Sequence, residues 1–196
     1  MPRLLPIDER LESAAQLVVR SRIFYDIWLY FEGAETRPAI IDTMRRFNEF
    51  FRFDPHAHFV AFVVHIAALF EMSEGNINLS SLAKEMKVAN MIPSQEVVEV
   101  DALFNQAKQS ASKAIILRSN LFAHRSDKLS YADAFRKAAV TPNQLRDLTE
   151  IALKIANRPL LARGFKHRVF NPQPRISAEE MLKALMQKNP NRERSA

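Results

Sequence analysis

The sequence predicts an all-α protein, a bundle of about five to seven helices followed by a C-terminal helical arm. Apolar residues recur at helical spacing through most of the chain. Only 3 of the 196 residues are glycine. Tight hairpins and phosphate-cradling loops need glycine, so this scarcity argues against a sheet and against a Rossmann or Walker-type nucleotide site. Residues 1–163 are expected to form the bundle, and residues 164–196 a basic, proline-containing arm with a short helix and a tail.

Composition narrows the class of protein further. With 47% hydrophobic and 26% charged residues, the chain has the balance of one globular domain. It has no cysteine, which excludes disulfides, thiol nucleophiles and cysteine-based zinc sites. The formal net charge of +6 suits a polyanionic partner such as RNA. The N-terminus lacks the apolar region of a signal peptide, and the strongest apolar run, Phe59 to Phe70, is too short to span a bilayer. We therefore expect a soluble, cytoplasmic protein without a membrane partner.

Three helices are predicted in the first half of the chain. The first runs from residue 8 to about 31, with acidic residues in its first turns, where the helix dipole favours them. Thr36 is placed to cap the second, which ends around residue 53. The third, over residues 54–72, is apolar on most sides and is expected at the centre of the bundle.

The second half contains further cap signals. A short helix is expected over residues 79–87. Ser94 is the expected N-cap of a long helix that has no breaker before about residue 126. Three later sites also carry a capping-box pattern, and each is expected to start a helix: Ser130, Thr141 (a helix to about Leu161) and Ser177 (a short helix over 181–187).

Two clusters of aromatic residues could each either contact RNA or pack in the core. Tyr25, Trp28 and Tyr30 could form a base-stacking platform, but aromatic residues at helical spacing favour a core. The stretch RRFNEFFRF, residues 45–53, could contact RNA through interleaved arginines and phenylalanines. A helix that packs its phenylalanines inward and keeps its arginines in water is the favoured interpretation.

The third helix contains histidines, which are common metal ligands, but the distance between them does not favour a metal site. His58 and His65 share a face two turns apart, and a separation of about 10 Å is too long for one ion without a further ligand. No metal ion is therefore expected there.

The stretch KAIILRSNLFAHRSDK, residues 113–128, places polar groups in an otherwise apolar run. Arg118 and His124 are separated by five residues. At about 100° per residue, Arg118 and Arg125 lie on one stripe of a helix, and Asn120 and His124 on a second. A neutral imidazole can accept a proton from a ribose 2′-OH, and a guanidinium can hold the phosphate as charge builds on it. Such chemistry needs no metal or other cofactor. The same spacing also fits a solvated arginine and a histidine bonded to a neighbouring carbonyl.

The phrase LRSNLFAHRSDK resembles the signature of the HEPN superfamily, an arginine followed by four to six residues and a histidine. It is most similar to the AbiU-like abortive-infection branch. The upstream stretch FDPHAHFVAFVVHIAALFEMSEGNINLSSLAKEMK resembles the long apolar helix, acidic turn and following short helix of that branch. The resemblance covers roughly residues 10–160 and implies a HEPN-like helical bundle.

The resemblance also implies roles for individual residues. In HEPN ribonucleases the motifs of two protomers face each other across a two-fold axis. His124 would then be the acid–base group and Arg118 the clamp on the phosphate and transition state. Asn120 would orient the imidazole or bind phosphate, and Arg125 would add charge to the groove. Ser119 departs from the pattern, because many active members carry Asn, Asp or His directly after the arginine.

Three hypotheses follow. The first is a metal-independent endoribonuclease in phage defence or a toxin–antitoxin pair, homodimeric, cleaving tRNA or mRNA, with an antitoxin as a further partner. The second is a catalytically silent HEPN module that binds RNA, a nucleotide or a protein. The third is an unrelated helical adaptor or DNA-binding regulator. Control by adenylylation of a tyrosine two residues after the histidine is not expected, because that position is Ser126.

Overall fold

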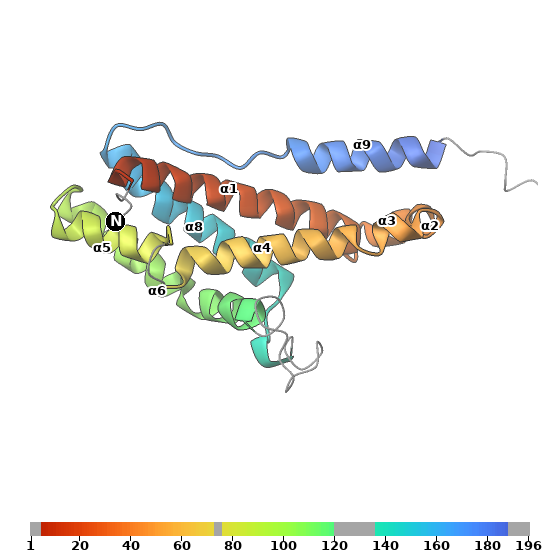
Figure 1. The fold of residues 1–196 in the computed structure, drawn as a ribbon, viewed down its shortest axis with the longest axis horizontal. Helices are drawn as coiled ribbons and strands as arrows, with labels where there is room; N and C mark the ends of the chain where they lie inside the picture. The colour runs from red at the N-terminus through yellow and green to blue at the C-terminus, as the bar shows by residue number, and fades with distance from the viewer. Residues whose placement is uncertain (1–4, 73–75, 120–135, 188–196) are drawn as a thin grey trace, which may run out of the picture.

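The computed structural model describes residues 5–72, 76–119 and 136–187, which contain eight helices and no strand. Four long helices build the bundle, and four shorter ones flank it (Figure 1). The long helices are α1 (Ile7–Glu32), α4 (Asp54–Phe70), α6 (Ser94–Leu117) and α8 (Pro142–Ala162). The shorter ones are α2 (Arg37–Arg46), α3 (Asn48–Phe51), α5 (Leu79–Val88) and α9 (Gln173–Gln187). The predicted all-α bundle is confirmed.

The core lies where α1 and α4 face each other, with α6 and α8 closing it from the other side. Val18, Tyr25, Phe62 and Ile66 are fully buried in this core. The rings of Tyr25 and Phe62 meet edge to face at 5.2 Å. Full burial of such side chains contributes roughly 1.5–3 kcal/mol each, so the α1–α4 seam supplies much of the stability of the bundle.

Helix α4 also belongs to the one described stretch, Asn48–Phe70, that is long and apolar enough to cross a membrane by length and composition. This stretch is longer than the run Phe59 to Phe70, which by itself is too short to span a bilayer. The core helix of a bundle meets the same criteria, and α4 packs against both α1 and α6. Phe59, Phe62 and Val63 on α4 are buried between these neighbours.

The prediction of one continuous second helix up to about residue 53 is wrong, because the structure has two separate helices there, α2 and α3. The chain leaves helical geometry at Phe47 (φ −111°, ψ 42°), which separates α2 from α3. Thr36 directly precedes α2, as expected, but its side chain does not cap the helix. Its hydroxyl instead donates to the carbonyl of Tyr30 at 2.5 Å, which closes the turn after α1.

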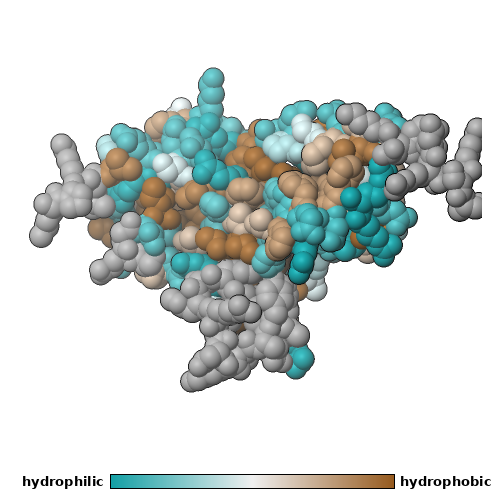
Figure 2. Space-filling model, turned by 45° about the vertical axis from the view of Figure 1, so that its right-hand side comes forward, coloured by the Kyte–Doolittle hydropathy of each residue, from teal (hydrophilic) through white to brown (hydrophobic). Residues whose placement is uncertain are grey.

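The expectation that the phenylalanines of this region all pack inward is also wrong. Phe51 is buried and meets the ring of Phe31 at 5.5 Å. Phe47, Phe50 and Phe53 are 39%, 54% and 60% exposed. Phe47 stands at the break between α2 and α3, and of the phenylalanines that follow it in this region only Phe51 reaches the core. Figure 2 shows apolar residues at the surface among hydrophilic ones.

Of the predicted N-cap residues of the later helices, Thr141 is confirmed, whereas Ser94 and Ser177 lie within their helices. Thr141 accepts from the backbone N–H of Gln144, and the Gln144 side chain accepts from the N–H of Thr141, so this capping box starts α8 as predicted. Ser94 is the first residue of α6 rather than its cap, which is Pro93. Ser177 lies inside α9, which already begins at Gln173. The pattern at Ser130 lies outside the described residues.

The segment after α8 returns along the bundle. Gly164 takes a positive φ of 78°, where a side chain would be strained, and an extended stretch then leads to α9. Asn157 of α8 holds this stretch, because its side-chain amide bonds both the N–H and the carbonyl of Arg168 at 2.9 Å. Helix α9 lies beside α1 (Figure 1), with Leu182 fully buried against Tyr30 and Phe31.

Candidate functional site

Arg118 lies at the C-terminal end of α6, on a helix fixed by small buried side chains. Ala107, Ala111 and Ala114 are buried in the core that α6 shares with α8. Because alanine is small, the two helices can approach closely. The α-helix ends at Leu117, and Arg118 and Ser119 continue it as a wider, π-type turn. Such turns are frequent at functional sites.

The Arg118 guanidinium forms an ion pair with the carboxylate of Glu71. Glu71 directly follows α4, with an extended backbone, and its N–H donates to the carbonyl of Ala67 at 2.9 Å. The C-terminal end of a helix carries partial negative charge, which disfavours a carboxylate there unless a cation lies beside it. Arg118 supplies that cation. The pair therefore fixes the side chain of Arg118 relative to α4.

Both partners of this pair remain accessible. The side chain of Arg118 is 25% exposed and that of Glu71 is 32% exposed. A guanidinium has five N–H donors, so a single carboxylate leaves donors free for another oxyanion. Ser119 is exposed on the same turn. The arrangement can bind a phosphate at the end of α6.

The other predicted site residues cannot be placed beside Arg118. Asn120, His124 and Arg125 lie outside the residues that the structure describes. Their predicted roles remain predictions. Glu71 was missed in the sequence as a functional residue. The available signal was its position as the first acidic residue after a long apolar helix, in the turn that leads to α5.

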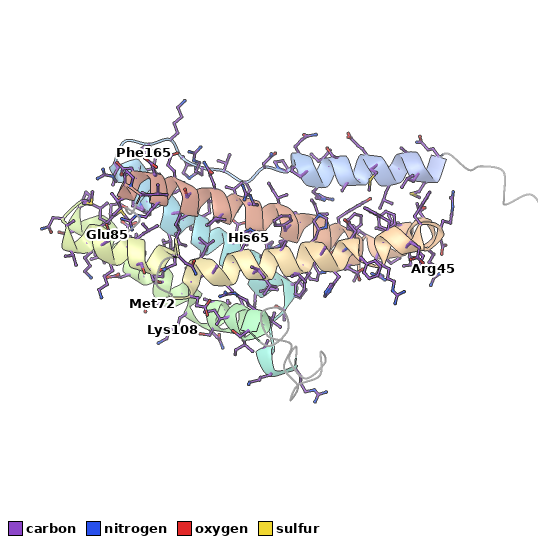
Figure 3. The ribbon with its side chains drawn as sticks, in the orientation of Figure 1. Arg45, His65, Met72, Glu85, Lys108 and Phe165 are labelled. Carbon is purple, nitrogen blue, oxygen red and sulfur yellow. The ribbon has the colours of Figure 1, made fainter. Side chains whose placement is uncertain are left out.

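Two hollows flank the α6 face near this end of the helix. The first, of about 680 Å³, lies between the end of α4, α5 and α6. Met72 and Lys108, which both line it, lie near each other in Figure 3. The second, of about 570 Å³, lies between α6 and the residues just before α8, among them Lys137. Arg118 lines neither hollow. Ile115, three residues before it, lines the first, and Ile116, two residues before it, lines the second.

The histidines of α4 are held by their own helix. His58 Nδ1 lies 2.9 Å from the Asp54 carbonyl, and His65 Nδ1 lies 2.5 Å from the Ala61 carbonyl. The ring of Phe24 packs against both imidazoles, at 5.9 and 5.5 Å. Within the described ranges, no group of three or more His, Cys, Asp or Glu side chains could hold a metal ion. These contacts account for the two histidines as parts of the packing between α1 and α4.

The aromatic residues of α1 are core residues, as favoured from the sequence. Tyr25 is fully buried, and its hydroxyl donates to the Pro142 carbonyl at 2.9 Å. Burial raises the pKa of Tyr25 to about 12. Trp28 packs on Phe59 with ring centroids 4.7 Å apart, and Tyr30 is 6% exposed. These contacts place the three aromatic residues in the packing between α1 and its neighbours.

Comparison with known proteins identifies the family. A family model described as AbiU2, of HEPN type, matches residues 4–182. No curated protein and no solved structure was found to match the chain. The match spans most of the sequence, from before α1 into α9, and the observed all-helical bundle agrees with it. The chain therefore belongs to the AbiU2 family of HEPN-type abortive-infection proteins.

Proposed function

We propose that this protein is a metal-independent endoribonuclease that acts in phage defence or in a toxin–antitoxin pair. In this proposal two protomers bring their motifs together in one composite site. Arg118 binds the scissile phosphate and His124 is the acid–base group. The observation that carries the proposal is the position of the Arg118 guanidinium, which is partly exposed at the end of a core helix and fixed by Glu71.

The proposed reaction needs only the side chains of the motif. The His124 imidazole accepts the proton of the ribose 2′-OH, and O2′ attacks the adjacent phosphorus. The P–O5′ bond breaks, and the departing 5′-oxygen takes a proton from the imidazolium. The products are a 2′,3′-cyclic phosphate and a 5′-hydroxyl. Arg118 stabilises the negative charge on the non-bridging oxygens in the transition state.

The ion pair with Glu71 supports the role of Arg118 physically. Catalysis by a fixed charge needs a group that is already oriented before the transition state forms. A long arginine side chain loses rotamer freedom when it pairs, and Glu71 has already imposed that loss. The exposed Ser119, together with Asn120 and Arg125 later in the motif, would contact the phosphate backbone or orient the imidazole.

The proposal extends to partners and place of action. The substrate would be tRNA or mRNA, the protein would act as a cytoplasmic homodimer, and an antitoxin would restrain it. A catalytically silent module that binds RNA, a nucleotide or a protein is the second candidate. Ser119 favours it, because many active relatives in the superfamily carry Asn, Asp or His after the arginine.

The test is cleavage of total cellular RNA in the presence of a chelator, with analysis of the product ends. The wild-type protein is compared with His124→Ala and with His167→Ala, which removes an exposed histidine in the extended arm. Fragments ending in a 2′,3′-cyclic phosphate are expected from the wild type and from His167→Ala, and none from His124→Ala. No cleavage in any RNA pool, or equal cleavage by His124→Ala, would exclude the proposed activity and favour the silent module.

A further inference from the structure

We propose that the two hollows along α6 form one track that holds single-stranded RNA beside Arg118. The inference rests on the proposed function, and it adds the form of the RNA and the residues that bind it. The track consists of the residues that line the two hollows. They come from the C-terminal end of α4, from α5, from α6, and from residues 137–139 shortly before α8. All of these residues belong to the described part of the chain.

The two hollows adjoin. Asn105, Lys108 and Ser112 line both of them, so the rim between the hollows is a single stripe of α6. The α6 residues of the first hollow extend from Val97 to Ile115, a length of about 27 Å at 1.5 Å per residue. Lys108 stands about 15 Å along the axis from Arg118 by the same rise. A strand lying in the track would therefore reach the candidate phosphate clamp.

The rim of the track is cationic. Lys84 and Lys87 of α5 and Lys108 of α6 line the first hollow, and Lys137 lines the second. Asp101 is the one carboxylate among the residues that line either hollow, and it pairs with Lys87 at 3.1 Å. Among the described residues, no ion pair involves Lys84, Lys108 or Lys137. Their charges are available to an anionic ligand.

The floor of the track is apolar. Phe70, Val100, Phe104 and Ile115 line the first hollow, and the rings of Phe70 and Phe104 meet edge to face at 6.3 Å. Both rings are only partly buried. Unpaired bases can stack on such rings, whereas the bases of a duplex are already stacked within the helix. An apolar floor between lysines therefore favours single-stranded over double-stranded RNA.

An acidic amphipathic helix of a protein partner would meet the same floor and lysines. Two observations favour RNA. The track runs along the helix that ends in Arg118, and it continues past Lys108 into a second hollow, where Lys137 adds a positive charge and no carboxylate is among the lining residues. A phosphate backbone carries a charge at each nucleotide and can meet lysines spaced along both hollows.

One lysine of the second hollow is excluded from the proposal. The ammonium of Lys113 donates to the Ala139 carbonyl at 2.6 Å and to the Gln144 side chain at 3.2 Å. These bonds fasten α6 to the chain that leads into α8. Lys113 thus has a structural role, and its replacement would disturb the fold rather than report on the track.

The experiment measures binding of a fluorescein-labelled oligouridylate by anisotropy at several salt concentrations. The protein is the full chain with His124→Ala, so that binding is read without cleavage. Lys84→Gln combined with Lys108→Gln is expected to weaken binding and to reduce the slope of log K against log salt by about 1.4, roughly 0.7 per phosphate contact. The matched control, Lys154→Gln with Lys166→Gln, removes the same charge from exposed positions outside the track.

Stacking is tested with Phe104→Leu, which keeps an apolar side chain and should leave the fold intact. It is expected to weaken binding about fivefold or more, the lower end of the loss for one stacked base, without changing the salt slope. An unlabelled RNA duplex of equal length should compete poorly. Equal affinity and slope in the two double-lysine variants, or competition by duplex as strong as by single strand, would overturn the track.

Cleavage assays separate this inference from the proposed function. If the wild type cleaves RNA and the Lys84/Lys108 variant cleaves with an unchanged KM, the track is wrong and the ribonuclease proposal stands. If no RNA is cleaved but binding depends on Lys84, Lys108 and Phe104, the track stands without catalysis. Binding of an acidic peptide in place of RNA would identify a protein groove and would also overturn the inference.

Discussion

The carboxylate of Glu71 and the guanidinium of Arg118 join the C-terminal ends of α4 and α6. Neither side chain is more than a third exposed. The pair has two consequences for the proposed ribonuclease. It orients Arg118, and it makes an incoming phosphate share the guanidinium with a carboxylate of the same sign.

Replacement of Glu71 by glutamine should strengthen RNA binding. Glutamine keeps an acceptor for Arg118 but removes the negative charge. A unit charge at about 4 Å is worth about 1 kcal/mol in water, which corresponds to roughly fivefold in affinity. Anisotropy with an oligouridylate in the His124→Ala background measures the change. Affinity that is unchanged or lower would show that Glu71 does not compete with the phosphate.

Arg118→Lys should lose most of the RNA cleavage, by tenfold or more, while the melting temperature changes little. Lysine keeps the positive charge but not the planar fork that binds two phosphate oxygens. Arg20→Lys, at an exposed position on α1, is the matched control and should retain activity. Full activity of Arg118→Lys would remove the guanidinium from the mechanism.

Loss of the phenol proton of Tyr25 should make the folded protein less stable in alkali. Burial raises the pKa of Tyr25 to about 12 in the folded protein, against about 10 in the unfolded chain. The folded state therefore holds the phenol proton more tightly. Its contribution is fully present below pH 10 and is lost as the pH rises toward 12, a change of roughly 2–3 kcal/mol.

Thermal unfolding between pH 8 and pH 12 tests this. Tyr25→Phe should lower the midpoint at neutral pH, because the Pro142 carbonyl loses a bond worth about 1 kcal/mol, and should flatten the alkaline decline. An equally steep decline in the variant would assign the alkaline loss to another group.

Leu182→Ala should loosen α9 from the bundle. Leu182 is fully buried between α9 and α1, and truncation of a buried leucine costs about 2–5 kcal/mol. Trypsin should then cleave the stretch between Gly164 and Arg175 faster than in the wild type. Met186→Ala, at an exposed position on the same helix, is the control. Equal cleavage of the two variants would mean that Leu182 does not hold the arm.

The long helices could be predicted from the sequence because their signals are local. Caps, acidic first turns and apolar periodicity placed α1, α4 and α8 to within a few residues. The break at Phe47 could not be predicted in this way. Residues 45–53 contain neither glycine nor proline, and the break accompanies a tertiary contact, the packing of Phe51 on Phe31.

The candidate site also has one part that local sequence signals predict and another that depends on tertiary contacts. Arg118 could be found from its motif, whereas its partner Glu71 could not, because the pair depends on where two helices end in space. The two polar stripes were derived at 100° per residue. That phase holds to Leu117, and the π-type turn at Arg118 and Ser119 then changes it.

Asn157 fixes the register of the extended arm on α8, which burial of apolar side chains alone would not do. Its amide meets the N–H and the carbonyl of one residue, Arg168, as a neighbouring strand would. Asn157 is 4% exposed while the arm lies in place. Because both bonds fall on one residue of the arm, a shift of the arm by one residue along α8 would break both bonds at once.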